Sequence, residues 1–168
     1  MRRMILPLML FVVGACQPTP PPAEQVNPLE GAWQISESSF TSPDTSYTIT
    51  DPQPSLYLFA ERHYSIMLVP VSEPRPLAVG DAPIIGAVDP TDAEKVASWD
   101  TFIANSGTYE VTDSTITIRP MVAKSANLMA AGGPLTYTYH VMEDMLHMTF
   151  APPWAPENET VTTLTRIR

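Results

Sequence analysis

The residues with the clearest potential for chemistry are two histidines that a predicted hairpin places opposite each other. If the turn falls at Glu143-Asp144, His140 pairs with His147 across the two strands. Two imidazoles at cross-strand distance could hold a metal ion, but zinc normally takes a third or fourth protein ligand, and the nearby sequence supplies none. Threonines share this face, which is the more polar one, so we expect an outer, solvated pair and no metal site.

Nucleophilic and acid–base catalysis have little support in the sequence. No serine lies in a Gly-x-Ser-x-Gly elbow, and no glycine loop of the phosphate-binding kind is present. His63 is expected in a turn between two apolar strands, and the adjacent carboxylates of Glu143-Asp144 are expected to form an exposed hairpin tip. The sequence therefore indicates no catalytic residue and no cofactor.

Aromatic and other apolar side chains that alternate with polar residues are the more informative set. Rings that carry hydroxyl groups suit a cavity that holds a largely apolar ligand by a few polar contacts. The alternative is a filled core, because a small barrel can pack its own side chains inside. The cavity candidates are Trp33, Tyr57, Phe59, Tyr109, Ile118, Tyr137, Tyr139, Met148 and Phe150.

The elements that must position these side chains are short β-strands. From Gly31 onward, runs rich in Thr, Tyr, Val and Ile alternate with polar residues and are broken by Pro, Asp, Asn and Gly, which is typical of an antiparallel sandwich or barrel. The predicted strands are Trp33 to Ser38, Tyr47 to Thr50, Leu56 to Phe59, Tyr64 to Val69, Gly107 to Val111, Thr115 to Arg119, Leu135 to Met142, Met145 to Ala151 and Thr160 to Ile167.

Two predicted hairpins define how the residues of their strands pair. A turn at Asp113-Ser114 pairs Tyr109 with Ile118, and the second hairpin pairs Tyr139 with Met148. In both hairpins one face is then apolar and the other polar, as a half-buried antiparallel pair requires. We expect the apolar faces to point inward.

One short helix is predicted between the strands. Residues Thr91 to Glu94 have the capping-box pattern, and Val96, Trp99 and Ile103 follow at helical spacing, with a stop near Asn105. An amphipathic helix of this length would lie against the sheet or cover one end of a barrel. A turn is expected at residues 125–127.

Length and charge limit the classes of partner. The 168-residue chain carries nine Lys and Arg against 18 Asp and Glu. Without residues 1–15 it would keep 153 residues, enough for one domain at 29–168, and a net charge of −11, since Arg2 and Arg3 leave with that segment. This charge argues against nucleic acid or an anionic lipid surface as partner, because both need clustered basic residues.

The first residues read as an export signal. Met1-Arg2-Arg3 precedes the apolar run Met4 to Val13, which is too short to span a bilayer, and small residues follow. The segment Val13 to Cys16 resembles the lipobox of bacterial lipoproteins, and Cys16 is the one cysteine of the chain. That resemblance implies a signal peptide at 1–15 and a membrane anchor of acyl chains, such as palmitate, on Cys16. An ordinary secreted protein with an incidental thiol is the alternative.

The resemblance to bacterial lipoproteins also predicts which membrane holds the protein. Gln17 is not the aspartate that typically retains lipoproteins in the inner membrane, so we expect the outer membrane, with the protein facing the periplasm. Residues 16–28 are rich in proline, which fixes φ and lacks an amide donor. They are expected to form an extended polyproline tether between the lipid and the domain.

The strand and helix segments also resemble the bacterial lipocalin-like domain family, in content and in order. The chain differs from the family pattern at two places. It has a longer insertion from Pro70 to Asp89, which we expect to be a mobile flap, and its turn at Asp113-Ser114 lacks glycine. The matching segments are Gly31-Ala32-Trp33 within Leu29 to Trp33, then Tyr64 to Met67, Ala93 to Ile103 and Gly107 to Val111. The resemblance covers nearly all of residues 29–168.

This family implies an up-and-down β-barrel of about eight strands that can enclose one small ligand, and it assigns no reaction. Three hypotheses follow for function. The first is an envelope-anchored barrel that binds a small hydrophobic molecule. The second is a barrel enzyme of the isomerase or cyclase type that uses tyrosine and histidine. The third is an envelope interaction protein that binds nothing inside.

Overall fold

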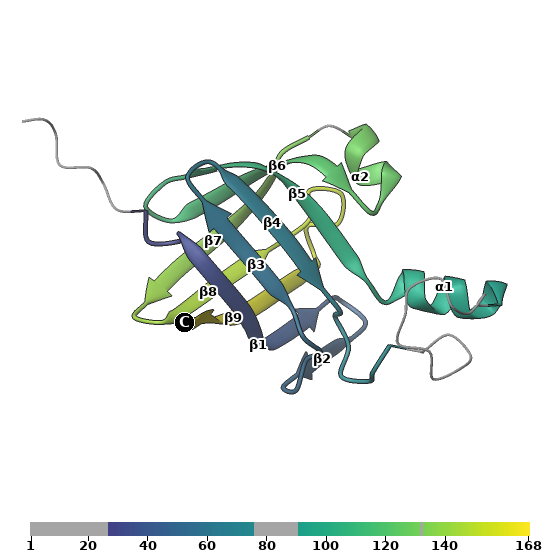
Figure 1. Ribbon diagram of the computed structural model, residues 1–168. Coiled ribbons are helices and arrows are strands. Elements are labelled where there is room, and N and C mark those ends of the chain that lie inside the picture. The colour runs from purple at the N-terminus through teal and green to yellow at the C-terminus, as the bar shows by residue number, and fades with distance from the viewer. Residues whose placement is uncertain (1–26, 76–90, 132) are drawn as a thin grey trace, which may run out of the picture.

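Strands dominate the part of the chain that the computed structural model describes, residues 27–75, 91–131 and 133–168 (Figure 1). The strands are β1 (Gly31–Thr41), β2 (Ser46–Ile49), β3 (Leu56–Ala60), β4 (His63–Leu68), β5 (Ile103–Val111), β6 (Thr115–Ala123), β7 (Leu135–Met142), β8 (Met145–Phe150) and β9 (Glu159–Ile167). Cys16 and the whole signal peptide lie outside the described residues, as does the predicted flap from residue 76 onward.

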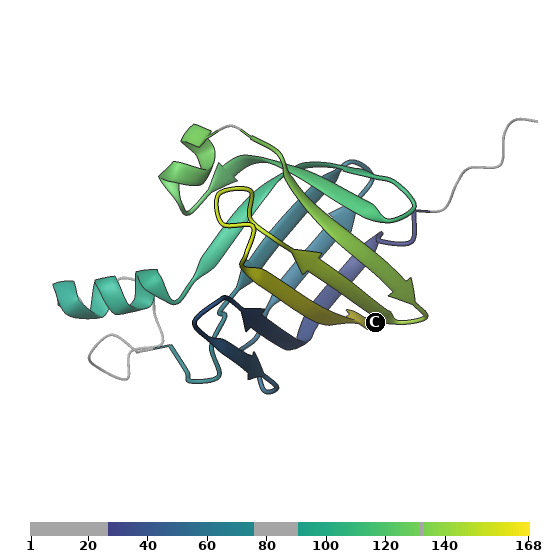
Figure 2. The same cartoon turned by 180° about the vertical axis from the view of Figure 1, so that it is seen from behind.

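The strands form one antiparallel sheet that closes on itself. Each strand from β3 to β9 pairs with its neighbour in sequence, β1 pairs with β3, and β9 pairs back onto β1. From behind, β9 lies between β8 and β1 and closes the wall (Figure 2). The result is a closed up-and-down barrel of eight strands, which confirms the predicted fold class. The extra strand, β2, pairs with the second half of β1.

The hairpin registers predicted from the alternation of apolar and polar residues are correct. Tyr109 pairs with Ile118 across β5 and β6, and Tyr139 pairs with Met148 across β7 and β8. Tyr109, Ile118 and Met148 are buried, and Tyr139 is half-buried. A slip of one residue would have turned each apolar face outward, so burial holds the strands in this register.

One end of the barrel is closed by the residues around Trp33. The indole is fully buried, and its Nε1–H donates to the carbonyl of Leu29 at 2.7 Å. The guanidinium of Arg166 lies 4.0 Å from the centre of the ring and donates to the carbonyls of Pro28 and Glu30. The chain before β1 is thereby fixed across this end.

Glycine is required at two places in the wall. Gly31 has φ +123°, and a Cβ there would lie 2.8 Å from Nη1 of Arg166, so the glycine before Trp33 leaves room for the guanidinium. Gly107 lies at a bulge between β5 and β6, where a Cβ would lie 2.0 Å from the carbonyl oxygen of Arg119. Gly107 was predicted to begin a strand, but it lies in the middle of a longer one.

The predicted helix exists, but its end was placed too late. Helix α1 (Asp92–Asp100) begins with the expected capping box, in which Thr91 and Glu94 bond each other's backbone N–H. Ile103 and Asn105 belong to β5, because Ile103 pairs with Leu68 and continues the ladder with β4. Pairing with an existing strand has overridden the helical spacing of Ile103.

The helices also differ from expectation in number and position. No residue of α1 is buried, and the helix points away from the barrel end instead of lying on the sheet or covering the opening (Figure 1). A second helix, α2 (Ala126–Ala131), replaces the turn expected at residues 125–127. Among the described residues, neither helix has the length and hydropathy that a bilayer crossing requires.

Candidate functional site

The barrel is hollow at the end opposite Trp33. A cavity of about 410 Å³ opens there, which is a typical size for a small-molecule site. Aliphatic side chains such as Ile35, Ile66 and Leu68 line it together with polar Ser38, Asn105, Thr160 and Thr162. Its aromatic lining consists of Phe40, Tyr47, Tyr57, Tyr137 and Phe150.

The nine predicted cavity residues divide between this opening and the packed core. Four of them, Tyr57, Tyr137, Met148 and Phe150, line the cavity, and Tyr57 and Met148 also belong to the buried core. Four others, Trp33, Phe59, Tyr109 and Ile118, belong to the buried core below it. Tyr139 lies near the hairpin turns at the closed end, where its hydroxyl donates to the carbonyl of Thr112 at 2.9 Å. A filled core and an open cavity therefore each occupy part of the barrel.

Polar atoms that the sequence did not single out meet the cavity at β4 and β5. The hydroxyl of Tyr64 donates to Oδ1 of Asn105 at 2.7 Å, and Asn105 lines the cavity. Tyr64 was detectable, since it alternates with Ile66 and Leu68 on the inward face of its strand. Asn105 was missed because it was assigned to the end of the helix.

Three tyrosines at or beside the cavity, Tyr57, Tyr64 and Tyr137, have raised pKa values. Burial raises the pKa of Tyr57, and the nearby Tyr137 raises it further. Burial also raises the pKa of Tyr137 to about 12 and the pKa of Tyr64 above its ordinary value. Among the described residues, no charged side chain is buried and none lines this cavity. A low dielectric without compensating charge explains the direction of all three shifts.

A row of rings leads from the cavity wall to its rim. Tyr137 stacks on Phe150 with 4.7 Å between ring centres, and Phe150 meets Trp154 edge-on at 6.3 Å. Trp154 is 71% exposed in the loop between β8 and β9. Trp154 therefore lies at the cavity entrance, next to the lining residue Phe150.

The two histidines of the second hairpin pair as predicted, on the outside of the barrel. His140 faces His147 across β7 and β8, and His140 is exposed. Nδ1 of His147 lies 3.1 Å from the hydroxyl of Thr163. Within residues 27–75, 91–131 and 133–168, no three His, Cys, Asp or Glu side chains gather in a way that could hold a metal ion.

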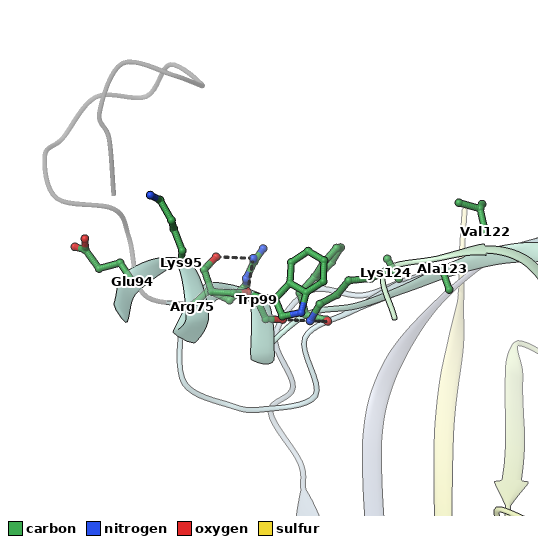
Figure 3. A pocket seen from close by; sticks show the side chains of 10 residues that line it. Arg75, Glu94, Lys95, Trp99, Val122, Ala123 and Lys124 are labelled. Atoms are coloured by element: carbon green, nitrogen blue, oxygen red, sulfur yellow. Dashed lines mark hydrogen bonds between the residues drawn. The ribbon is translucent and has the colours of Figure 1, made fainter. Parts of the chain in front are cut away.

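A second hollow of about 640 Å³ lies outside the barrel, between α1 and the ends of β5 and β6 (Figure 3). Its cations are engaged by the helix. Lys124 lies 4.6 Å from the Trp99 ring centre and donates to the carbonyls of Trp99 and Phe102, while Arg75 stacks on Phe102 and donates to Ser98. These contacts attach α1 to the barrel, so we regard the barrel cavity as the candidate site.

Closed up-and-down topology, a buried closing tryptophan and one open end define a lipocalin-like β-barrel. Two solved structures are similar to it. A lipocalin-like protein from Bacteroides uniformis has 13% identity and a TM-score of 0.43, over 84% of this chain and 100% of that one. An uncharacterized protein from Bacteroides eggerthii has 11% identity and a TM-score of 0.41, over 83% and 99%. No family model and no curated protein sequence matches the chain.

Proposed function

We propose that this protein is a lipid-anchored binding protein of the bacterial cell envelope that takes up one small, mainly apolar molecule in the open end of its barrel. The observation that carries the proposal is the 410 Å³ cavity, whose wall combines rings, aliphatic side chains and a few hydroxyl groups. Such a lining favours an apolar body by burial and orients it through a small number of hydrogen bonds.

The anchor and the opening belong to opposite ends of the barrel in this proposal. The described chain begins at Asn27, whose side-chain amide donates to the hydroxyl of Tyr109 at 2.5 Å near the closed end. A tether that runs from Cys16 to this point would hold the closed end toward the membrane. The cavity would then exchange its ligand with the aqueous compartment, or with a partner there, through the rim at Trp154.

A blocking substitution tests the binding function. Ser38 lines the cavity, whereas its neighbour Ser39 does not. Ser38→Trp should fill the opening and reduce the binding of a neutral apolar fluorescent probe at least tenfold, and the matched Ser39→Trp should bind the probe as the parent chain does. Equal binding by both variants, or no binding by the parent chain, would contradict the proposal. Native mass spectrometry of the chain extracted from its host identifies the bound molecule.

The two other functions considered from the sequence receive less support. An isomerase or cyclase would need an acid–base pair at the cavity, and none of the histidines His63, His140 and His147 lines it, nor does any described carboxylate. A pure interaction protein would need no cavity of ligand size. Ligand binding is therefore the function that the described geometry favours.

A further inference from the structure

Among the polar groups that line the cavity, those of Tyr57, Tyr137 and Asn105 lie near one another, since Tyr137 is close enough to affect Tyr57 and Tyr64, and Tyr64 bonds Asn105. Within the described residues, the hydroxyls of Tyr57 and Tyr137 form no hydrogen bond, although both residues line the cavity. Asn105 uses its Oδ1 to accept from Tyr64, which leaves its Nδ2 amide as a donor. Tyr64 is thus a positioning residue, because its hydroxyl fixes which way the amide of Asn105 points.

These groups suit an oxygen that accepts hydrogen bonds. Two hydroxyls and one amide can donate up to four N–H or O–H bonds, and the hydroxyls can also accept. Leaving such buried groups unpaired costs about 1–3 kcal/mol each, so a ligand without a polar atom would gain less from this site than one that pairs them.

The described lining of the cavity carries no positive charge that would neutralise an anion. Within the described residues the cavity lining contains no Lys, Arg or His, and Arg75 and Lys124 of the second hollow contact Phe102 and Trp99 on the outside of the barrel. Moving a carboxylate into such a site without a partner charge is far more costly than moving an alcohol or an ester. The raised tyrosine pKa values report the same penalty on negative charge.

We infer that the site selects uncharged ligands: a neutral, mainly apolar molecule whose one hydrogen-bonding oxygen is held by Tyr57, Tyr137 and Asn105, in preference to a fatty-acid anion of the same length. This inference rests on the proposed binding function and specifies its ligand class. The outer wall of the barrel and the cations near α1 take no part in it.

Two ligands of the same chain length, one neutral and one charged, distinguish the effect of charge on affinity from the effect of hydrophobicity. The full chain in nanodiscs of zwitterionic phosphatidylcholine is titrated with dodecanol and with dodecanoate, each displacing a neutral fluorescent probe, with empty nanodiscs as the baseline. At about pH 8, where the acid is ionised, dodecanol should bind at least about tenfold more tightly. At about pH 5 the gap should narrow, because part of the acid is then neutral.

Tyrosine-to-phenylalanine variants test the hydroxyl groups without changing the volume of the cavity wall. The double variant Tyr57→Phe/Tyr137→Phe should lower the affinity for dodecanol about threefold to tenfold, the effect of losing one or two hydrogen bonds. Tyr139→Phe removes a hydroxyl near the closed end and should leave the affinity unchanged. Circular dichroism confirms that each variant is folded.

The outcomes distinguish the inference from the function on which it rests. If both ligands bind equally at about pH 8, or if dodecanoate binds more tightly, the selectivity for neutral ligands is wrong and the binding function stands. An unchanged affinity of the double variant for dodecanol contradicts the role of the tyrosines. If neither ligand displaces the probe from the parent chain, both the inference and the proposed function fail.

Discussion

Arg166 connects several parts of the closed end of the barrel. Its guanidinium stacks over Trp33, donates to two carbonyls of the chain before β1 and lies 3.8 Å from a carboxylate oxygen of Asp144. Arg166 thereby links the last strand to the first, across more than 130 residues of sequence. It also explains the motif at the start of β1, since Gly31 leaves space for the guanidinium and Trp33 supplies the ring.

Substitution of this arginine should therefore destabilise the barrel. Arg166→Ala removes the cation–π contact and leaves the carbonyls of Pro28 and Glu30 without a donor, so we expect the free energy of unfolding in urea to fall by about 2 kcal/mol. Arg168→Ala is the control, because Arg168 also bonds Asp144 but is 82% exposed. A loss below about 0.5 kcal/mol is expected for the control. Equal losses in both variants would contradict the role of the stacked guanidinium.

At the scale of single residues, alternation in sequence was a good guide to side-chain direction and a poor guide to depth. Tyr109 and Tyr137 were both predicted to face inward, and both do, yet one is packed in the core and the other lines the cavity. Depth along the barrel depends on strand tilt and on which strands meet across the interior. The alternation of apolar and polar residues along one strand contains no information on strand tilt or on which strands meet.

Among the elements, α1 has the weakest connection to the rest of the fold. It buries no residue, and Val96 and Trp99 are 58% and 59% exposed. Among the described residues, Arg75 and Lys124 supply hydrogen bonds that hold it near the barrel (Figure 3). A helix of nine residues is marginal on its own in water, so its order depends on these side chains and on its capping box.

Lys124→Met tests this attachment, because methionine keeps much of the apolar stem and loses the donor to the carbonyls of Trp99 and Phe102. We expect amide hydrogen exchange within α1 to become about tenfold faster, the effect of losing about 1.4 kcal/mol of local stability, while exchange in β7 and β8 stays unchanged. Arg119→Met, which removes an exposed ion pair with Glu110, should alter neither region. Exchange that accelerates equally throughout the barrel would show that Lys124 supports the whole fold.

The element boundaries show what the sequence could supply and what it could not. The start of α1 was predictable, since the capping box of Thr91 and Glu94 is a local signal. Its end was not, because Ile103 has the spacing of a helix and is drawn into β5 by pairing with Leu68, 35 residues earlier. The hairpins were predictable in register, whereas the closure of β9 onto β1 depends on contacts between strands at opposite ends of the domain, which no local pattern encodes.

At the scale of the whole molecule, the buried tyrosines should make stability decline at high pH. Burial raises the pKa of Tyr57, Tyr64 and Tyr137 in the folded state, whereas a tyrosine of the unfolded chain titrates near about 10. Above about pH 10 the unfolded state therefore binds fewer protons than the native state, and the free energy of unfolding falls as pH rises. Below about pH 10 these groups are protonated in both states and contribute no pH dependence.

Urea unfolding at several pH values between about 8 and 12 measures this decline, with a slope of up to about 1.4 kcal/mol per pH unit for each tyrosine involved. Tyr137→Phe should flatten the slope by part of that amount, because one of the titrating groups is gone. Tyrosinate absorbance, followed in parallel, should rise late in the native protein and early in urea. A slope unchanged by Tyr137→Phe would contradict the burial of this hydroxyl.

The amino-terminal anchor concerns the molecule together with its membrane. If Cys16 carries the acyl chains, labelled palmitate should enter the parent chain and should not enter Cys16→Ser, and the mature chain should begin at residue 16 with the mass of the lipid attached. We expect the substitution to leave the barrel folded, because the described contacts of the closed end, such as the bond between Asn27 and Tyr109, do not involve Cys16. A mature chain with a free thiol at Cys16 would instead favour the ordinary secreted protein.

The substitution Gln17→Asp tests the choice of membrane separately from the acylation of Cys16. Each acyl chain contributes about 0.8 kcal/mol per buried methylene, so two or more chains hold the protein firmly in whichever membrane receives it. If the proposed anchor and location hold, the variant should keep its label and move from the outer to the inner membrane on density-gradient fractionation, since the lipobox-like segment Val13 to Cys16 is unchanged. Because the cavity opens at the end opposite Asn27, ligand binding by the variant should equal that of the parent chain. A variant that stays in the outer membrane would contradict the predicted role of Gln17 without contradicting the proposed acylation of Cys16.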